Sequence, residues 1–583
     1  MDNCNIAVAR AAAQCNVVIV HMETQPSQKT SIPSSVDVAV IGSGLGGLCA
    51  ATYLAERGLS VAVFESHYVA GGCATQFVRG NRAARYRFDV GLHYIGDCEA
   101  DGTIPRILAD LGAHVDFASL DPDGFDELVF PDLRFRIPAD LERYRARLCD
   151  AFPHEKRGIE RYVALVATVM RLARTMDRYE GKRPPWSSLP RLALDLLNMA
   201  PHRNATIGKL LDGMIRDPRL RAVICGQHGD YGLPPSQVSA ALHLGLAGHY
   251  FRGAYYPKGG GQVIADRVAE RFEALGGTIH LRSPIERILM ENGRAVGVRV
   301  RRARDSGDGA PSDVRARCVL SNADLKRTLL ELVGPEALPA SWLTRANDFT
   351  MASPLFMTFL GLQGSPAELG MRAANYWQCD DYDLEEAYRA RATPAESVRG
   401  CYITSGSLKD PENAVHHAPP GESTVEVMAL VPGSIASWGV AGEGVAGWRY
   451  RREAFYAEQK QAIEEQLVAR LDALFPGAAE RIRYRESATP VTHLRFTGAT
   501  GGTGYGLACT PAQFMNNRPG YRGPLEGLYF AGASMRAGHG IVGAMMSGRS
   551  AAACILRDGL RADSRARQRQ SDSTVLASAS PTT

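Results

Sequence analysis

The sequence lacks the short motifs that mark several common enzyme classes. Its 583 residues contain no HExxH, no P-loop and no GxSxG, so a metalloprotease, a nucleotide hydrolase and a serine hydrolase have no support. The 12 cysteines are dispersed singly, with no CxxC pair and no Cys/His cluster at zinc spacing. They are typical of small buried hydrophobes in a reducing compartment, so we predict neither a disulfide framework nor a metal site.

Long apolar runs and a strong net charge are also missing. No segment approaches the roughly 18 uninterrupted apolar residues of a membrane-spanning helix. The net charge of +4 is small and the basic residues are scattered, so nothing requires a nucleic-acid partner. The stretch WSSLPRLALDLLNMA, residues 186–200, is apolar with few charges. It is compatible with a patch that lies on a bilayer and admits a lipid, and equally with a core helix.

Residues 37–66, DVAVIGSGLGGLCAATYLAERGLSVAVFES, have the pattern of a nucleotide-binding βαβ unit. The apolar periodicity predicts a strand, a glycine-rich turn, a helix and a second strand, at residues 37–41, 42–47, 48–57 and 60–64. Gly42 makes the tight turn, Gly44 lets the backbone approach a pyrophosphate, and Gly47 lets the helix pack on the strand. Glu65 ends the second strand, where a carboxylate accepts hydrogen bonds from a ribose and repels an NADP 2′-phosphate. The unit therefore favours FAD or NAD.

The rest of the chain alternates between segments with and without nucleotide-fold character. We predict an α/β fold, in which a Rossmann-like FAD-binding domain is assembled from discontinuous segments around an inserted α+β substrate domain. The FAD-binding parts are residues 36–100, 251–335 and 486–556, and the substrate parts are 101–250, largely helical, and 336–485. Residues 1–35 are an extension and residues 557–583 a polar tail, both expected without fixed structure. Met22 would be a natural start, which would make residues 1–21 an upstream extension.

Several motifs after Glu65 resemble one family. ESHYVAGGCATQF, FDVGLHYIG, GDYGLPPSQVSAALH, HYFRGAYYPKGG and GLYFAGASMRAGHGIVGAMMSG are similar to the retinol saturase and carotenoid isomerase branch of the phytoene desaturase-like flavoproteins. The resemblance runs from about residue 36 to 556. It implies FAD in a two-domain flavoprotein fold and a long apolar tunnel for a polyene or other unsaturated lipid.

The resemblance also implies a set of cofactor-binding positions. These are Gly42, Gly44, Gly46, Gly47, Glu65, Gly71, Gly72, Ile285, Gly532, Ala533, Gly540, Ile541 and Val542. By position, Gly42, Gly44 and Gly47 would meet the pyrophosphate, Glu65 would meet the adenosine ribose, and Ile285 would meet the adenine. The residues from Gly532 to Val542 would lie near the ribityl chain and flavin ring, at a helix N-terminus. Many relatives have an acidic residue where this chain has Ala533, so any hydrogen bond to the ribityl chain there must come from the backbone.

Catalytic side chains are harder to predict from the sequence. His93, in GLHYIG, is the first candidate for a proton donor or acceptor beside the flavin. Other candidates in or beside the family motifs are Tyr94, His228, His243, His249 and His539. Each of these histidines is also compatible with a structural imidazole. Lys258, in YPKGGG, is compatible with a flavin or carboxylate contact and, more simply, with a solvated turn.

The sequence therefore predicts an FAD-dependent oxidoreductase that saturates, desaturates or isomerises a C=C bond in a polyene or other unsaturated lipid. No second dinucleotide fingerprint is visible, so the electron donor stays unknown. One alternative is a lipid-binding protein without catalysis, as in the Rab escort and GDP-dissociation-inhibitor proteins of this superfamily, but such a chaperone does not need the ribose carboxylate. Another is a flavin amine oxidase. We expect a cytoplasmic protein that can also bind peripherally to a membrane.

Overall fold

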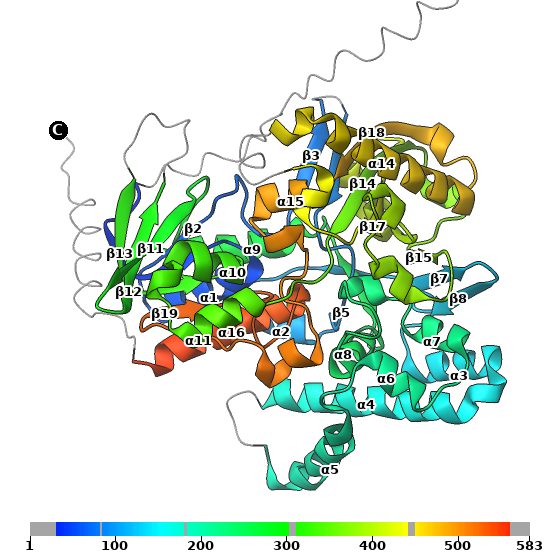
Figure 1. Ribbon diagram of the computed structural model, residues 1–583, viewed down its shortest axis with the longest axis horizontal. Coiled ribbons are helices and arrows are strands. Elements are labelled where there is room, and N and C mark those ends of the chain that lie inside the picture. Colours follow the sequence, from blue (N-terminus) through cyan, green and yellow to red (C-terminus); the bar gives the residue numbers. More distant parts are fainter. Residues whose placement is uncertain (1–30, 82–83, 180–183, 302–310, 441–448, 560–583) are drawn as a thin grey trace, which may run out of the picture.

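The computed structural model describes residues 31–81, 84–179, 184–301, 311–440 and 449–559. Most of the two predicted tails, 1–35 and 557–583, lies outside these ranges. Regular structure begins with β1 (Ser35–Ile41) and ends with α16 (Gly540–Arg557). Ser35 and Arg557, which we expected in the tails, therefore belong to these two elements. Figure 1 shows two large sheets side by side, with a group of helices below the second sheet.

The first sheet has a Rossmann-like parallel core. Its strands lie in the order β10-β2-β1-β13-β12-β11, and β19 also pairs with β13. The pairs of β1 with β2 and β13, of β2 with β10 and of β13 with β19 are parallel, whereas β11 and β12 form an antiparallel extension. Besides β1, the strands are β2 (Val61–Phe64), β10 (Thr278–His280), β11 (Ile285–Glu291), β12 (Arg294–Val300), β13 (Ser312–Ser321) and β19 (Leu528–Phe530).

Helices cover both faces of this sheet because successive side chains of a strand point to opposite faces. Val38 and Val40 pack against α1 (Leu45–Glu56) and α16, while Ala39 and Ile41 pack on the opposite face. Near that face are α10 (Leu325–Arg327) and α11 (Ala340–Asp348). α1 and α16 cross so closely that a Cβ atom on Gly548 would lie 2.3 Å from the carbonyl oxygen of Gly46. The observed architecture confirms the predicted α/β class with discontinuous segments.

The second sheet is mainly antiparallel and has the strand order β18-β14-β17-β16-β15-β7-β8. Its strands are β7 (Asp126–Phe130), β8 (Leu133–Ile137), β14 (Leu355–Gln363), β15 (Asn375–Cys379), β16 (Gly400–Thr404), β17 (Glu422–Leu430) and β18 (Ile482–Ala488). α14 (Ala454–Leu474) covers one face, where Ile463 and Leu467 pack against Leu360 and Val427. The other face looks toward the first sheet and forms a wall of the cavities described below.

The helical part lies beside β7 and β8 (Figure 1). Its helices are α3 (Leu141–Ala151), α4 (Lys156–Arg178), α5 (Leu189–Met199), α6 (Ile207–Asp212), α7 (Pro218–Ile224) and α8 (Ala240–Tyr250). The remaining elements used here are α2 (Thr103–Asp110), α9 (Gln262–Ala274), α13 (Ala414–His417), α15 (Pro490–Thr497), the hairpin β3 (Gln76–Gly80) and β4 (Arg85–Asp89), and the small sheet of β5 (Ile95–Gly96), β6 (Phe117–Ser119) and β9 (Ala254–Pro257). The predicted domain boundaries stay a prediction.

The first helix begins earlier than the sequence pattern indicated. We expected residues 48–57, whereas α1 begins at Leu45 and includes Gly46 and Gly47. Glycine is a poor helix former, but here a Cβ atom on Gly47 would lie 2.3 Å from the Gly42 carbonyl oxygen. The close approach of strand, turn and helix therefore overrides the local propensity.

Candidate active site

Two cavities meet between the sheets, and the larger has a volume of about 1230 Å³. It lies at the carboxyl ends of β1 and β2, the edge at which open α/β sheets bind nucleotides. This volume is above the roughly 300–1,000 Å³ usual for small-ligand pockets, so a dinucleotide-sized group is a suitable occupant. Most of the predicted cofactor residues line it: Gly42, Gly44, Gly46, Glu65, Gly71, Gly72, Ile285, Gly532, Ala533, Gly540 and Ile541.

Two predicted residues do not line this cavity. Gly47 lies behind the turn, where it allows the tight packing described above. Val542 lines the smaller cavity instead. The individual cofactor contacts of all these positions stay predictions, but the structure brings most of them to one wall.

The glycine turn forms a cradle that a side chain would fill. Gly42 has a φ angle of +89°, a conformation that favours glycine, and a Cβ atom on Gly44 would lie 2.7 Å from Asn322 Nδ2. Gly44 is the N-cap of α1, where no side chain accepts a hydrogen bond and the first turn carries no acidic residue. The free N–H groups and the positive end of the helix are therefore suited to an anion such as a pyrophosphate.

Glu65 is held at the wall of the larger cavity by local hydrogen bonds. One carboxylate oxygen accepts from Ser43 N at 2.8 Å and Ser43 Oγ at 2.7 Å, and the other from His67 N at 2.8 Å and Ser66 Oγ at 3.2 Å. A carboxylate offers about four acceptor sites, so all of them are in use. Two of the donors are hydroxyls that can rotate to other acceptors, which leaves room for the hydroxyls of a ribose.

Asn322 is a cavity residue that the sequence did not single out. It follows β13 directly, and its Oδ1 atom is buried without a hydrogen-bond partner among the described residues. A buried acceptor without a donor is costly. The same atom lies close to Gly46 and Gly532, 2.6 and 2.8 Å from the positions that their Cβ atoms would take. A hydroxyl of a bound cofactor would satisfy it, so the residues present fit a polyhydroxylated dinucleotide.

The smaller cavity has a volume of about 590 Å³ and a mainly apolar wall. Its apolar side chains come from α4, α8 and the start of α16, among them Val169, Met170, Leu242, Leu246, Ile541, Val542 and Met546. The residues that line both cavities are Gly91, His93, Leu355, Met428, Tyr505, Gly540 and Ile541, and we call them the junction. An apolar chamber thus opens directly onto the glycine-lined cavity.

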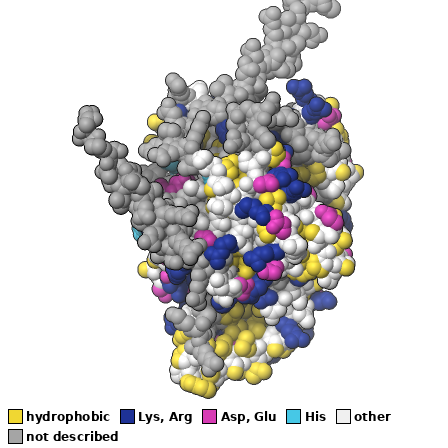
Figure 2. All heavy atoms as spheres, turned by 90° about the vertical axis from the view of Figure 1, so that its left-hand side faces the viewer, with side chains coloured by type: hydrophobic (Ala, Val, Ile, Leu, Met, Phe, Trp, Pro, Cys, Tyr) yellow, Lys and Arg dark blue, Asp and Glu magenta, His cyan; other side chains and the backbone are white. Residues whose placement is uncertain are grey.

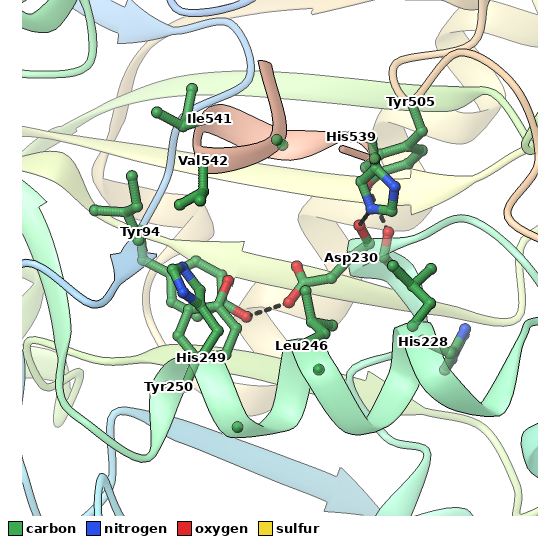
Figure 3. Close-up of a pocket in the computed structure, with 18 of the residues that line it drawn as sticks. Tyr94, His228, Asp230, Leu246, His249, Tyr250, Tyr505, His539, Ile541 and Val542 are labelled. Atoms are coloured by element: carbon green, nitrogen blue, oxygen red, sulfur yellow. Dashed lines mark hydrogen bonds between the residues drawn. The ribbon is translucent and has the colours of Figure 1, made fainter. Parts of the chain in front are cut away.

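Asp230 is an acidic group in the wall of this apolar chamber. Tyr94 donates from its hydroxyl to Asp230 Oδ2 at 2.6 Å, and the same hydroxyl is 3.2 Å from Asp126 Oδ2. Figure 3 shows Asp230 facing Tyr94 and Tyr250, with His539 on its other side. Burial, and next the charge of Asp126, raise the pKa of Asp230 to about 8. The carboxyl group therefore holds a proton at neutral pH.

The position of Asp230 next to the junction is fixed by its backbone. His539 Nε2 is 3.1 Å from the carbonyl oxygen of Asp230, and the junction residue Tyr505 donates to the carbonyl oxygen of Gly229 at 2.5 Å. Neither Asp230 nor its neighbour Asp126 was predicted. The only signal was the motif GDYGLPPSQVSAALH, which carried the family resemblance without a role for its aspartate.

The predicted histidines divide into three groups. His93 lies at the junction, and its Nδ1 atom is 2.9 Å from Glu426 Oε2, which leaves Nε2 for a ligand. His228, His249 and His539 line the smaller cavity, and burial lowers their pKa values to about 4, so they are neutral at pH 7. His243 lies outside both cavities, 3.2 Å from the hydroxyls of Tyr162 and Tyr231, which is a structural position.

Two lysines have contrasting surroundings. Lys258 lies outside both cavities and pairs with Glu412 at the surface. Lys409, which the sequence did not suggest, is buried and donates to the carbonyl oxygen of His93 at 2.6 Å and to Thr404. Burial lowers the pKa of Lys409 to about 8. This lysine therefore fixes the backbone of the junction at His93.

Metal and disulfide chemistry have no basis in the described part of the chain. Every cysteine there is a free thiol, and no group of three or more potential metal ligands occurs within those ranges. None of the described helices combines the length and hydrophobicity needed to cross a membrane.

A family model described as "flavin containing amine oxidoreductase" matches residues 45–413 and 443–556. The chain belongs to this family. It is an FAD-dependent oxidoreductase, and FAD is the group that the glycine cradle, Glu65 and Asn322 fit. The FAD prediction is thereby confirmed, while the role of each residue toward FAD stays a prediction.

Named relatives place this flavin oxidoreductase within the family. All-trans-retinol 13,14-reductase of Danio rerio is 27% identical over 529 residues, covering 86% of this chain and 83% of that protein. Chloroplastic prolycopene isomerase of Arabidopsis thaliana is 25% identical over 542 residues, covering 91% and 84%. These relatives confirm the resemblance to the retinol saturase and carotenoid isomerase branch.

Solved structures show the same fold. An oxidoreductase from Methanosarcina mazei superimposes with a TM-score of 0.55 at 18% identity and covers 88% of this chain and 99% of its own. A putrescine oxidase bound to putrescine gives a TM-score of 0.55 at 16% identity, with coverages of 90% and 99%. At this level of identity the likeness supports the architecture alone.

Proposed function

We propose that this flavin oxidoreductase reduces a C=C bond of an apolar polyene or other unsaturated lipid, with isomerisation as the related outcome. The observation that carries the proposal is the junction, where the apolar chamber opens onto the glycine-lined cavity. An elongated apolar substrate in the smaller cavity would reach the cofactor there. The names of the relatives, a retinol reductase and a prolycopene isomerase, support the same substrate class.

The chain's own residues have separable tasks in this reaction. Bound FAD supplies the two-electron redox chemistry. Saturation of a C=C bond adds a hydride to one carbon and a proton to the other. Asp230 holds a proton at its carboxyl group beside the junction, Tyr94 orients that group, and an apolar substrate that fills the chamber would displace water from it. His93, fixed by Glu426, is the second group placed to move a proton.

The test is an anaerobic titration of the FAD-loaded protein followed by its visible spectrum. The flavin is reduced with dithionite, and all-trans-retinol or a carotene is then added in detergent. Reoxidation of the flavin with loss of one polyene double bond is expected. A changed geometry without net redox would make the protein an isomerase, and bleaching of oxidised flavin by the polyene would make it a desaturase.

Other outcomes would overturn the proposal. If no flavin binds after reconstitution, the protein is a lipid-binding protein without catalysis. If an amine bleaches the oxidised flavin and oxygen is consumed, it is an amine oxidase.

A matched pair of variants locates the substrate: Gly245→Leu projects into the smaller cavity, whereas Gly213→Leu lies at an exposed helix end. Only Gly245→Leu should slow reoxidation by the polyene, and both should keep the flavin spectrum.

A further inference from the structure

The helix α5 and its surroundings expose several large apolar side chains to solvent. Trp186 is 88% exposed, Leu197 69% and Leu196 54%, and Met176 on the neighbouring α4 is 66% exposed. With Leu194, these residues make up what we call the α5 surface. Figure 2 shows hydrophobic side chains gathered at the lower end of the molecule, where Figure 1 places α5. Contiguous exposed apolar side chains of this kind mark an interaction site.

The single acidic residue of α5 points away from this surface. Asp195 is only 3% exposed, and Arg171 of α4 donates to its carboxylate at 2.7 Å. The exposed side of α5 is therefore mainly apolar, with Arg191 and Asn198 as its exposed polar side chains, and carries no carboxylate. A core helix would have buried its leucines and exposed its acid, so the exposure of these leucines excludes the core-helix interpretation of residues 186–200.

Arginines border the α5 surface. Among the described residues from 174 to 203, the exposed charged side chains are Arg174, Arg178, Arg191 and Arg203. An apolar face bordered by basic side chains is the pattern of a helix that lies in the interface of an anionic bilayer. A two-fold dimer through this face would instead bring the arginines of two copies together.

The α5 surface is continuous with the wall of the smaller cavity. Met170, Ala173 and Met176 of α4 line that cavity, and α4 packs against α5. Met176 thus belongs both to the cavity wall and to the exposed apolar surface. An apolar molecule that leaves a bilayer at α5 would enter the chamber along α4, past Met176 and beside Arg174 and Asp177, which line the same part of the wall.

We propose that the α5 surface docks on the headgroup and upper acyl region of an anionic lipid bilayer, and that the smaller cavity receives its substrate there. This inference rests on the proposed function for the identity of the substrate, while the docking itself is independent of it. A peripheral position on the cytoplasmic side of a membrane is part of the same proposal.

The experiment measures co-sedimentation of the FAD-loaded full chain with vesicles of phosphatidylcholine and phosphatidylglycerol in equal parts, and with phosphatidylcholine alone. The wild type should bind the anionic vesicles, and the double variant Leu194→Glu/Leu197→Glu should lower the bound fraction at least tenfold. The control is Val415→Glu, which places a single negative charge, half of what the double variant adds, at a side chain that is 72% exposed on α13. It should bind as the wild type does.

A spectroscopic readout reports the contact directly. Tryptophan fluorescence should shift to shorter wavelength when anionic vesicles are added, and Trp186→Phe should remove most of the shift. Equal vesicle binding of the wild type and the double variant would overturn the proposal. So would a concentration-dependent dimer, in sedimentation velocity, that only the double variant abolishes, because the α5 surface would then be a contact between copies.

The docking and the proposed function can fail separately. If reduced enzyme is reoxidised by a polyene in detergent but never binds vesicles, the docking is wrong and the function stands. If vesicles bind but no polyene reoxidises the flavin in either medium, the function is wrong and the docking stands on co-sedimentation alone.

Discussion

The buried carboxyl group of Asp230 gives the sharpest test of the site, through the variant Asp230→Asn. Burial and the charge of Asp126 raise its pKa from 3.8 to about 8 in the folded protein. Between these two pKa values the unfolded chain has released the proton and the folded protein has kept it. The folded state then binds more protons than the unfolded state, so the free energy of unfolding falls as the pH rises.

The size of the effect follows from the width of that pH window. Each pH unit inside the window costs the wild type up to about 1.4 kcal/mol, so the loss from pH 5 to pH 7 is at most about 3 kcal/mol. The value is an upper limit because the carboxyl group faces a cavity that water can enter. The Asp230→Asn variant keeps the shape of the side chain and loses this contribution to the pH dependence.

The assay compares urea denaturation of the FAD-loaded wild type and Asp230→Asn at pH 5 and pH 7. Relative to the variant, the wild type should lose about 1–3 kcal/mol over this range. The control variant Asp150→Asn removes an exposed carboxylate on α3 and should leave the pH dependence unchanged. An infrared difference spectrum should show the band of a protonated carboxyl group in the wild type at pH 7 and not in Asp230→Asn. If the stability difference is the same at both pH values and the band is absent, Asp230 is ionised and cannot supply the proton.

Two further predictions concern the cofactor and the junction. Glu65→Gln removes a charged acceptor at the cavity wall. The free energy of FAD binding should weaken by about 1.5–3 kcal/mol, which is a ten- to hundredfold loss of affinity. Equilibrium dialysis with flavin fluorescence measures the affinity, and an unchanged value would show that Glu65 does not bind FAD. His93→Asn should slow the reoxidation of reduced flavin by a polyene about a hundredfold while FAD still binds, as expected for a proton-transfer group. Stopped-flow absorbance measures the reoxidation rate, and an unchanged rate would make His93 a structural residue.

The cofactor cavity could be predicted because its signal is local in the sequence. Gly42, Gly44 and Glu65 belong to one βαβ unit, and the spacing within that unit fixes the backbone around the ligand. Asp230, Asn322 and Lys409 could not be predicted in the same way. Their properties come from burial among elements far apart in the chain, as when Asp126 of β7 and Tyr94 after β4 meet Asp230.

Residues 186–200 show the same limit at the surface. Their apolar composition is compatible with a core helix and with a membrane contact, because composition does not reveal which side faces the protein. The decision depends on Arg171, which lies 24 positions from Asp195 and turns that acid inward. Once the acid is fixed, the leucines on the other side of α5 must face solvent.

The start of α16 links the two cavities and bears on the charge state of a bound cofactor. Gly540 and Ile541 line the junction, the N-cap His539 makes no side-chain capping hydrogen bond to the helix, and the first turn carries no acidic residue. The positive end of this helix therefore favours negative charge on a bound cofactor, which is the charge of the reduced form. Ala533, in the wall of the same cavity, adds no opposing charge. A protonated Asp230 likewise adds no negative charge to the neighbouring chamber. These features make a bound flavin easier to reduce by its electron donor, and the same carboxyl group holds the proton that saturation needs.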